Sequence, residues 1–336
     1  MSHTVAELSA TLARHARGLR RPGWRTPLLV GAAGLAASFL YVQARTAAVE
    51  KAHPPAGKFV EVDGVRLHYL EQGSGPVLVL LHGNGVTSND FVLSGLFDAA
   101  SAHYRVIAFD RPGFGYSERP AGTVWTPEAQ AKLIYQALHT LHIERPIVVG
   151  HSWGTLVSLA LALDYPRYVR AIGLIGGYFY PNARLDAAIL ALPATPVLGH
   201  LWRYTGAPLL GRLMWPRLVK KMFAPAAAPE KFDALPPWMA LRPSQLGASA
   251  AESGLMVPAA ARLMERYREL IMPVALIAGS GDRIIDARKN SVRLHQEISH
   301  SDLRLEGGAG HMAHYADPAD VMAAIDKLDR DARAGI

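Results

Sequence analysis

Three residues of different type, widely spaced along the chain, could together carry out nucleophilic catalysis: Ser152, Asp282 and His311. A serine hydroxyl is a weak nucleophile, so it needs a histidine as general base, and the histidine needs a carboxylate to orient it. Ser152 lies in GHSWG (150–154), Asp282 ends GSGD (279–282) and His311 ends GAGH (308–311). These residues predict attack of Ser152 on a carbonyl carbon, followed by an acyl intermediate on the serine.

The segment around Ser152 has the pattern of a tight strand-to-helix turn. Residues 146–149 (PIVV) are short and β-branched, as in a strand buried on both faces. Residues 155–163 are rich in Ala and Leu and end before DYP, as in a buried helix that stops at proline. Glycine at 150 and 154 leaves room for this turn, which would present the hydroxyl beside the N-terminus of the helix.

The base and the acid each have a rival. His311 follows a glycine-rich loop that could approach Ser152 closely, whereas most of the thirteen other histidines lack such a loop. His314 is the plausible alternative to His311, and Asp286 is the alternative to Asp282. We expect His311 because of its glycine-rich loop, and Asp282 because GSGD directly follows the apolar run 274–278, which reads as a strand.

The negative oxygen that forms during acyl transfer needs N–H donors that are already in place. The backbone N–H of Trp153, the residue after the nucleophile, is one expected donor. The backbone N–H of Asn84, in the turn HGNG (82–85), is the other. The alternative for this second segment is a glycine-containing turn without a catalytic role.

Short apolar runs and amphipathic stretches alternate along the chain and predict the elements that position these residues. A hairpin is expected around Asp63-Gly64, and a mostly parallel, doubly wound α/β sheet after it. The expected parallel strands are 77–81, 105–109, 147–150, 171–175, 274–278 and 302–305. Helices are expected near 90–100, 126–141, 153–164, 287–297 and 318–330. About a hundred residues between Ile175 and Val274 lack a strand pattern, which indicates a helical cap over the edge where active sites lie.

The N-terminus has the composition of a membrane anchor. Residues 1–26 hold five Arg and one Glu, which accounts for +4 of the net charge of +7, so the rest of the chain is not basic enough to suggest nucleic-acid binding. Residues 26–44 carry no charge and would span about 28 Å as a helix. The predicted organisation is a cytoplasmic arm (1–25), a transmembrane anchor (26–44), a linker (45–57) and an extracytoplasmic remainder. The alternative is a signal peptide cleaved after Ala44.

Five motifs occur in an order that resembles the α/β-hydrolase superfamily: HGNG, DRPGFGYS (110–117), GHSWG, GSGD and GAGH. The resemblance covers about residues 58–330 and indicates the serine-nucleophile branch with a helical cap. It implies a hydrolase core formed by 58–177 and 271–332, with the cap, 178–270, inserted between strands 6 and 7. It also implies that residues 110–117 shape the loop beside the active site.

The same superfamily holds esterases, dehalogenases, epoxide hydrolases and proline iminopeptidases. The resemblance implies an aspartate nucleophile in the dehalogenases and epoxide hydrolases, where this chain has Ser152. Iminopeptidases bind an amine with carboxylates, whereas residues 178–270 hold eleven Lys and Arg and six Asp and Glu. We therefore predict a membrane-anchored serine hydrolase that cleaves esters of apolar acyl groups, resembling carboxylesterases or lipases.

Four alternatives remain open: an iminopeptidase-like enzyme, a carbon–carbon bond hydrolase, a perhydrolase or transacylase that uses the same acyl-enzyme with another acceptor, and a binding module without catalysis. The chain contains no cysteine, so disulfides and thiolate metal sites are excluded. The predicted chemistry needs neither a metal nor an organic cofactor. The sequence makes no prediction of the oligomeric state.

Overall fold

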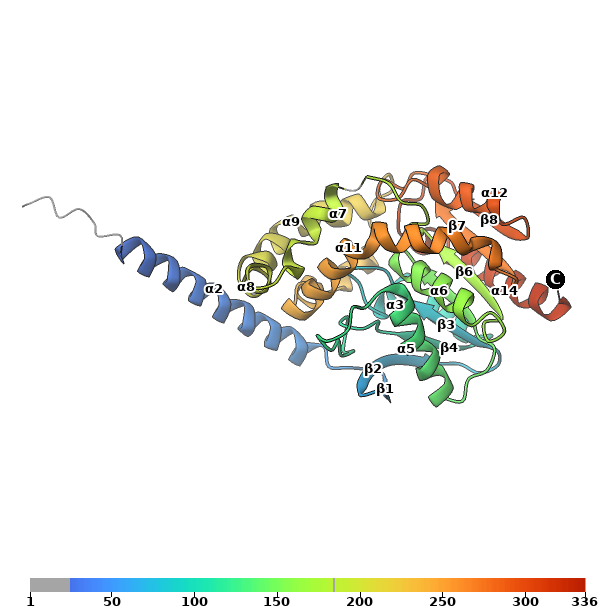
Figure 1. Ribbon diagram of the computed structural model, residues 1–336, viewed down its shortest axis with the longest axis horizontal. Coiled ribbons are helices and arrows are strands. Elements are labelled where there is room, and N and C mark those ends of the chain that lie inside the picture. The colour runs from blue at the N-terminus through green and yellow to red at the C-terminus, as the bar shows by residue number, and fades with distance from the viewer. Residues whose placement is uncertain (1–24, 184, 336) are drawn as a thin grey trace, which may run out of the picture.

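The computed structural model describes residues 25–183 and 185–335, and its centre is an eight-stranded sheet (Figure 1). The strand order is β1-β2-β4-β3-β5-β6-β7-β8. The hairpin β1–β2 is antiparallel, β2 is antiparallel to β4, and every other neighbouring pair is parallel. The strands are β1 Lys58–Val62, β2 Val65–Gln72, β3 Val77–Leu81, β4 Arg105–Phe109, β5 Ile147–His151, β6 Ala171–Ile175, β7 Val274–Gly279 and β8 Ser301–Glu306.

Helices cover both faces of the sheet, which confirms the predicted doubly wound architecture. Successive side chains of a strand point to opposite faces. Leu78 and Leu80 of β3 accordingly belong to the apolar cluster of α4 and α14, and Val79 and Leu81 belong to that of α5 and α6. The core helices are α3 Asn89–Ser94, α4 Leu96–Ser101, α5 Pro127–Thr140, α6 Trp153–Asp164, α12 Arg293–Glu297, α13 Ala313–Ala316 and α14 Pro318–Ala334, with a π-helical turn at Arg288–Val292.

The helical cap lies between β6 and β7, as predicted from the sequence. Its long helix α11 runs along one side of the core, and α7, α8 and α9 lie beyond it (Figure 1). A shorter helix, α10, and three 3₁₀ turns connect these elements. The cap helices are α7 Leu185–Leu190, α8 Leu198–Tyr204, α9 Gly206–Phe223, α10 Pro237–Ala240 and α11 Pro243–Leu263, and the turns are Leu192–Ala194, Glu230–Ala234 and Met264–Glu269.

The N-terminal helix α2, Arg25–Ala52, extends away from the body of the molecule (Figure 1). Its segment Pro27–Ala52 has a mean hydropathy of 1.5, and among the described helices it alone is long and apolar enough to cross a membrane. Residues 45–52, which the sequence analysis assigns to a linker, instead continue this helix. The basic arm lies outside the described residues, except for Arg25.

The C-terminal half of α2 packs against the cap. Val42 is fully buried, and the Ser38 hydroxyl donates to the Thr205 carbonyl at 3.0 Å. Glu50 pairs with Arg242 at 2.9 Å. The helix is therefore attached to the cap by side-chain contacts as well as by the chain itself.

Candidate active site

Ser152 stands between β5 and α6, in the strained turn that the sequence predicts. Its φ of 51° and ψ of −117° are rarely adopted by a residue with a side chain. The Ser152 N–H donates to the Ile175 carbonyl at 2.8 Å, which ties the turn to the neighbouring strand β6. Glycine is required at position 154, because a Cβ there would lie 2.1 Å from the Leu81 carbonyl oxygen.

Ser152, His311 and Asp282 form one hydrogen-bonded chain. His311 Nε2 lies 2.9 Å from Ser152 Oγ, and His311 Nδ1 lies 2.8 Å from Asp282 Oδ2. If Nδ1 donates to the carboxylate, Nε2 keeps its lone pair for the serine proton. The structure therefore brings together the three residues that the sequence analysis selects from segments up to 159 positions apart.

Residues outside the triad hold both Asp282 and His311 in position. The second oxygen of Asp282 accepts the N–H groups of Ile284 and Ile285 at 2.7 and 3.0 Å, which fixes the carboxylate. The His311 N–H donates to the carbonyl of Met222, a cap residue at the end of α9, at 2.9 Å. The rival Asp286 instead accepts the N–H groups of its own turn and is exposed.

The HGNG turn lies directly against the serine. A Cβ placed on Gly83 would be 3.1 Å from Ser152 Cβ, so only glycine fits there without displacement. The Gly83 carbonyl accepts a hydrogen bond from Arg111 Nη2 at 3.0 Å and lies 2.7 Å from His82 Nδ1. Since the C=O and N–H of a trans peptide point in opposite directions, these bonds direct the Asn84 N–H away from Arg111.

Arg111 is a fully buried cation whose five N–H donors all have acceptors. It donates to the carbonyls of His82 and Gly83, to Gln130 Oε1, and to both oxygens of Glu252 on α11. Glu252 is equally buried and also accepts from Gln130 Nε2 at 2.9 Å. A buried ion pair between core and cap thus holds the carbonyls of the HGNG turn.

Asn84 contacts the same cap helix with its side chain. Its Nδ2 donates to the Ser249 carbonyl at 3.0 Å and to Ser253 Oγ at 3.3 Å. The backbone position assigned to Asn84 by the sequence analysis is therefore held on one side by Arg111 and on the other by α11.

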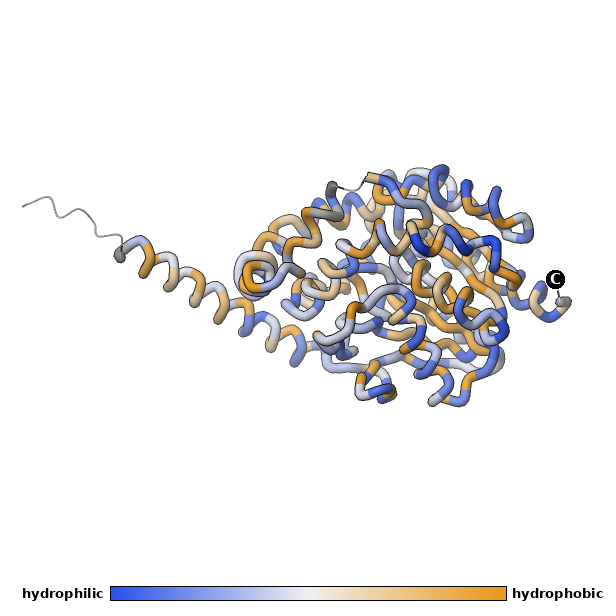
Figure 2. The backbone as a smooth tube through the Cα atoms, in the orientation of Figure 1, coloured by the Kyte–Doolittle hydropathy of each residue, from blue (hydrophilic) through white to orange (hydrophobic). Residues whose placement is uncertain are grey.

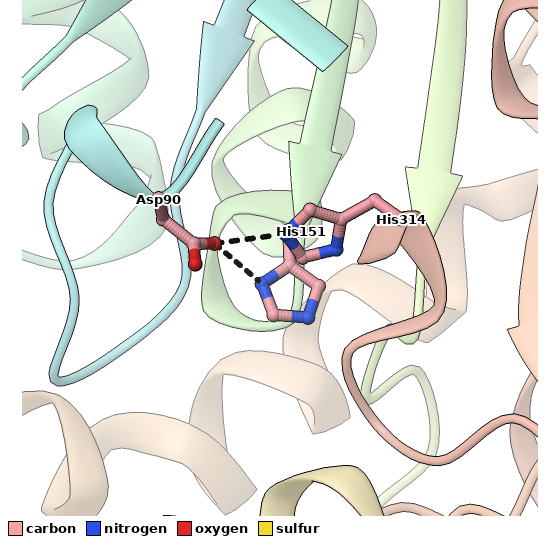
Figure 3. Close-up of side chains that lie close together, drawn as sticks. All are labelled: Asp90, His151 and His314. Atoms are coloured by element: carbon pink, nitrogen blue, oxygen red, sulfur yellow. Dashed lines mark hydrogen bonds and ion pairs between the residues drawn. The ribbon is translucent and has the colours of Figure 1, made fainter. Parts of the chain in front are cut away.

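His314, the rival base, is hydrogen-bonded to Asp90 in a buried cluster with His151 (Figure 3). Its Nε2 lies 2.9 Å from Asp90 Oδ2. His151 Nε2 lies 3.1 Å from the His311 carbonyl, so His151 supports the backbone of His311. Burial, followed by the neighbouring His314 and His311, lowers the pKa of His151 well below its ordinary value, so this ring is neutral.

The cluster of Asp90, His151 and His314 also contains ligand types that metals accept. One possible ligand atom from each lies within 4.8 Å of the others. The Asp90 carboxylate already accepts hydrogen bonds from His314 and from the Tyr315 hydroxyl, and His151 bonds the His311 carbonyl. These hydrogen bonds use Nε2 of each imidazole and support the loop that carries His311, whereas Nδ1 of His151 and of His314 has no hydrogen-bond partner among the described residues.

The sequence predicts no individual role for Arg111, Gln130 or Glu252, although Arg111 belongs to the motif 110–117. One signal for Glu252 was available: it is the single charged residue between Arg242 and Arg262, in a helix otherwise built from small and apolar residues. A lone charge on a buried helix needs a partner of opposite charge. The His82 side chain also belongs to this network: its Nε2 accepts the Arg111 backbone N–H at 2.9 Å, and burial and the Arg111 charge lower its pKa to about 3.

A cavity of about 670 Å³ separates the loop after β4 from the cap. Trp125, Tyr204 and Leu255 supply apolar surface, and Arg119 and Arg203 supply positive charge. Ser152 does not line this cavity. The apolar acyl pocket above Ser152 stays a prediction.

A model of the alpha/beta hydrolase fold family matches residues 76–318 of the chain. The chain is 31% identical over 129 residues to haloalkane dehalogenase 2 of Mycobacterium tuberculosis, covering 38% of this chain and 44% of that protein. The chain thus spans less than half of that relative. It is 28% identical to the 2-hydroxy-6-oxo-2,4-heptadienoate hydrolase of Pseudomonas putida, over 76% of this chain and 89% of the relative.

Among solved structures, the crystal structure of a membrane phospholipase A, described as a novel bacterial virulence factor, has a similar fold. The two chains share 21% sequence identity with a TM-score of 0.59, and the match covers 99% of each chain. At this identity the likeness concerns the fold.

Proposed function

Because the chain belongs to the α/β-hydrolase fold family, we propose that it is a serine hydrolase that cleaves carboxylic esters of apolar acyl groups. The observation that carries this proposal is the hydrogen-bonded chain Ser152–His311–Asp282, with separations of 2.9 and 2.8 Å. A serine within reach of an imidazole that is itself bound to a carboxylate is the arrangement that acyl transfer requires.

The reaction proceeds in two halves. Ser152 Oγ attacks the ester carbonyl while its proton passes to His311 Nε2, and the imidazolium then protonates the departing alkoxide to release the alcohol. Water next attacks the acyl-enzyme, giving one proton to His311, which returns it to Ser152 Oγ as the carboxylic acid leaves. Asp282 holds the imidazole in the required tautomer and balances its charge.

The backbone N–H groups of Asn84 and Trp153 are the proposed donors to the oxyanion. Trp153 begins α6, so its N–H has no acceptor within the helix. Gly83 lies against Ser152, and the fixed Gly83 carbonyl orients the next N–H. Two such donors are typical of enzymes that stabilise a tetrahedral oxyanion.

The substrate class rests on the cap and on the anchor. The helix α2 is apolar and belongs to the same chain as the site, so esters with long apolar acyl groups would be concentrated beside the enzyme. A free amine is a poor match for a cap in which Lys and Arg outnumber Asp and Glu.

We assign the N-terminus to the cytoplasm and the catalytic domain to the opposite side of the membrane, because the arginine excess precedes α2. An uncleaved anchor is favoured over a signal peptide. Cleavage after Ala44 would remove Val42, which is fully buried against the cap, and Ser38, which bonds Thr205. Sequencing of the mature N-terminus tests this, and a terminus at Arg45 would refute the anchor.

Labelling by a fluorophosphonate probe, with p-nitrophenyl ester turnover in parallel, tests the activity. The wild-type chain should be labelled and should turn over, and Ser152→Ala should retain neither property while keeping its thermal transition. The removed side chain is small and partly exposed, so the fold should not suffer. Ester turnover by Ser152→Ala at the wild-type rate would refute the assignment, and absence of labelling in the wild type would favour a non-catalytic module.

A carbon–carbon bond hydrolase is the second candidate, favoured by the match to the 2-hydroxy-6-oxo-2,4-heptadienoate hydrolase over 76% of the chain. The same three residues could serve a vinylogous diketone. Measurement of kcat/KM for that relative's substrate beside a p-nitrophenyl ester decides between the two, and the larger value identifies the function.

A further inference from the structure

The cap exposes an unusual concentration of large apolar side chains. Of the sixteen exposed large hydrophobic residues that follow α2 in the described chain, twelve lie between Ile189 and Leu218. The most exposed are Val197 at 80%, Leu213 at 76% and Leu198 at 75%. We call these twelve residues the cap apolar face. Large apolar side chains exposed in such number within one segment indicate a surface that contacts a membrane or another protein.

The position of the cap apolar face beside α2 indicates what covers it. Cap helix α8 contacts α2 through Tyr204, whose ring centroid lies 6.2 Å from that of Phe39. The Thr205 carbonyl accepts the Ser38 hydroxyl at 3.0 Å. Figure 2 shows apolar residues of α8 and α9 on the side of the body from which α2 extends.

The depth of these contacts along α2 is informative. Ser38 and Phe39 lie inside the uncharged run of residues 26–44, before the first charge at Arg45. Arg45 follows Ser38 by seven positions, or about 10 Å of helix at 1.5 Å per residue. If α2 crosses a bilayer, the end of α8 and the start of α9 therefore lie deeper in the membrane than Arg45, where the charged part of α2 begins.

Charge identifies the kind of lipid. Residues 187–229 contain five Lys and Arg and no Asp or Glu. Four of the five, Arg212, Arg217, Lys220 and Lys221, lie on α9 and are exposed beside the cap apolar face. Apolar side chains bordered by cations are typical of helices that lie in a membrane interface rich in anionic headgroups.

We propose that the cap apolar face is immersed in the bilayer leaflet on the catalytic side, with the α9 cations on anionic phospholipid headgroups. The cap is then a second membrane contact, beside the anchor. This inference rests on the proposed anchoring of the chain by α2. It goes further by placing a part of the enzyme body, rather than the N-terminal helix alone, within the lipid.

Spin labels on single cysteines test the proposal in the full-length chain, which has no cysteine of its own. Leu213→Cys probes the cap apolar face, Val124→Cys is a matched control on a core loop with 70% exposure, and Val30→Cys in α2 has 68% exposure. The protein is placed in nanodiscs that hold one copy each and contain phosphatidylglycerol. Collisions of each label with oxygen, which enters lipid, and with a water-soluble nickel chelate are measured.

We expect the Leu213 label to collide roughly tenfold less often with the nickel chelate than the Val124 label, and more often with oxygen. Replacing phosphatidylglycerol by phosphatidylcholine should reduce the difference in nickel collision frequency between the two labels. Equal nickel collisions at Leu213 and Val124, with Val30 protected, would overturn the immersion of the cap but leave the anchor intact. Free access of nickel to Val30 would refute the anchor itself. Protection of Leu213 only in discs with two copies would identify a second chain as the partner and overturn the proposal.

Discussion

The core edge around Ser152 and the outer surface of the cap differ in a basic respect: the core buries a charged side chain, whereas the cap exposes large apolar ones. The core buries a full charge, Arg111, and gives every one of its donors an acceptor. The cap leaves Leu213 and Val197 76% and 80% exposed. A buried charge is tolerated only when it is fully bonded, whereas an exposed apolar side chain acquires its partner from outside. The charge of the first region is therefore satisfied within the chain, whereas on our membrane proposal the apolar side chains of the second are covered by lipid.

The core and the cap meet near the site through contacts that include Glu252 with Arg111, Asn84 with Ser249, and His311 with the Met222 carbonyl. The nucleophile itself belongs to the core alone. Experiments that remove core contacts, shared contacts and peripheral groups in turn can measure how far catalysis depends on each region.

The largest effect is expected within the core. His311→Ala should lower kcat by about three orders of magnitude or more, because the serine loses its base. His314→Gln, which keeps a donor for Asp90, should stay within about tenfold of the wild type in kcat and lose thermal stability instead. Ester kinetics and thermal melts of both variants check this. If the His314 variant were inactive and the His311 variant active, His314 would be the general base and His311 would not.

An intermediate effect is expected at the boundary. Glu252→Gln leaves Arg111 buried beside a neutral partner and loosens the HGNG turn, so kcat should fall about ten- to a hundredfold, or 1.4–2.7 kcal/mol, with little change in KM for a short ester. Glu265→Gln, an exposed cap carboxylate, is the matched control and should leave kcat unchanged. If both variants behave alike while the thermal transition of Glu252→Gln is intact, the cap does not support the turn.

A smaller effect concerns the substrate. Each methylene buried in an apolar acyl pocket contributes about 0.8 kcal/mol, so kcat/KM should rise about fourfold per added methylene until the pocket is full. Medium-chain p-nitrophenyl esters should exceed the acetate, and aminoacyl anilides should be poor substrates. Preference for acetate, or rapid release of N-terminal proline, would refute the apolar pocket while leaving the triad intact.

The smallest effect is expected at Glu306, a carboxyl group that, among the described residues, is not paired with a positive charge as Glu252 is. Burial, followed by the neighbouring Asp320, raises the pKa of Glu306 from 4.5 to about 7. A raised pKa in the fold means that the favourable protonated form is lost as pH rises through about 7, and that stability falls with it. Glu306→Gln should therefore raise Tm by a few degrees at pH 8 and leave it unchanged at pH 5. An equal shift at both pH values would assign the effect to packing.

Strands β3, β4 and β6 begin and end at the residues predicted from the sequence, because a buried parallel strand is a solid apolar run between turns. The end of α2 could not be predicted in this way. Arg45, Glu50 and Lys51 suggested a solvated linker, yet the Arg45 guanidinium stacks over Trp238 at 5.4 Å and Glu50 pairs with Arg242. These partners lie almost two hundred residues away, and their position depends on the path of the cap.

The residues of the candidate active site also fall into those that local sequence predicts and those that it does not. The order of Ser152, Asp282 and His311 is visible in local motifs, since each lies at the end of a strand. The pairing of Arg111 with Glu252, 141 residues apart, depends on how the cap helix crosses the core. Local pattern carries the first kind of information, and only the folded chain carries the second.

The Arg111–Glu252 pair also limits how the cap could be exchanged. Insertions of this kind are natural modules for grafting between related scaffolds, since both ends return to adjacent strands, β6 and β7. Here a donor cap without a carboxylate at the position of Glu252 would leave Arg111 as an uncompensated buried cation. A chimera of this core would therefore have to import the acid together with the cap, or replace Arg111 by a neutral residue in the same step.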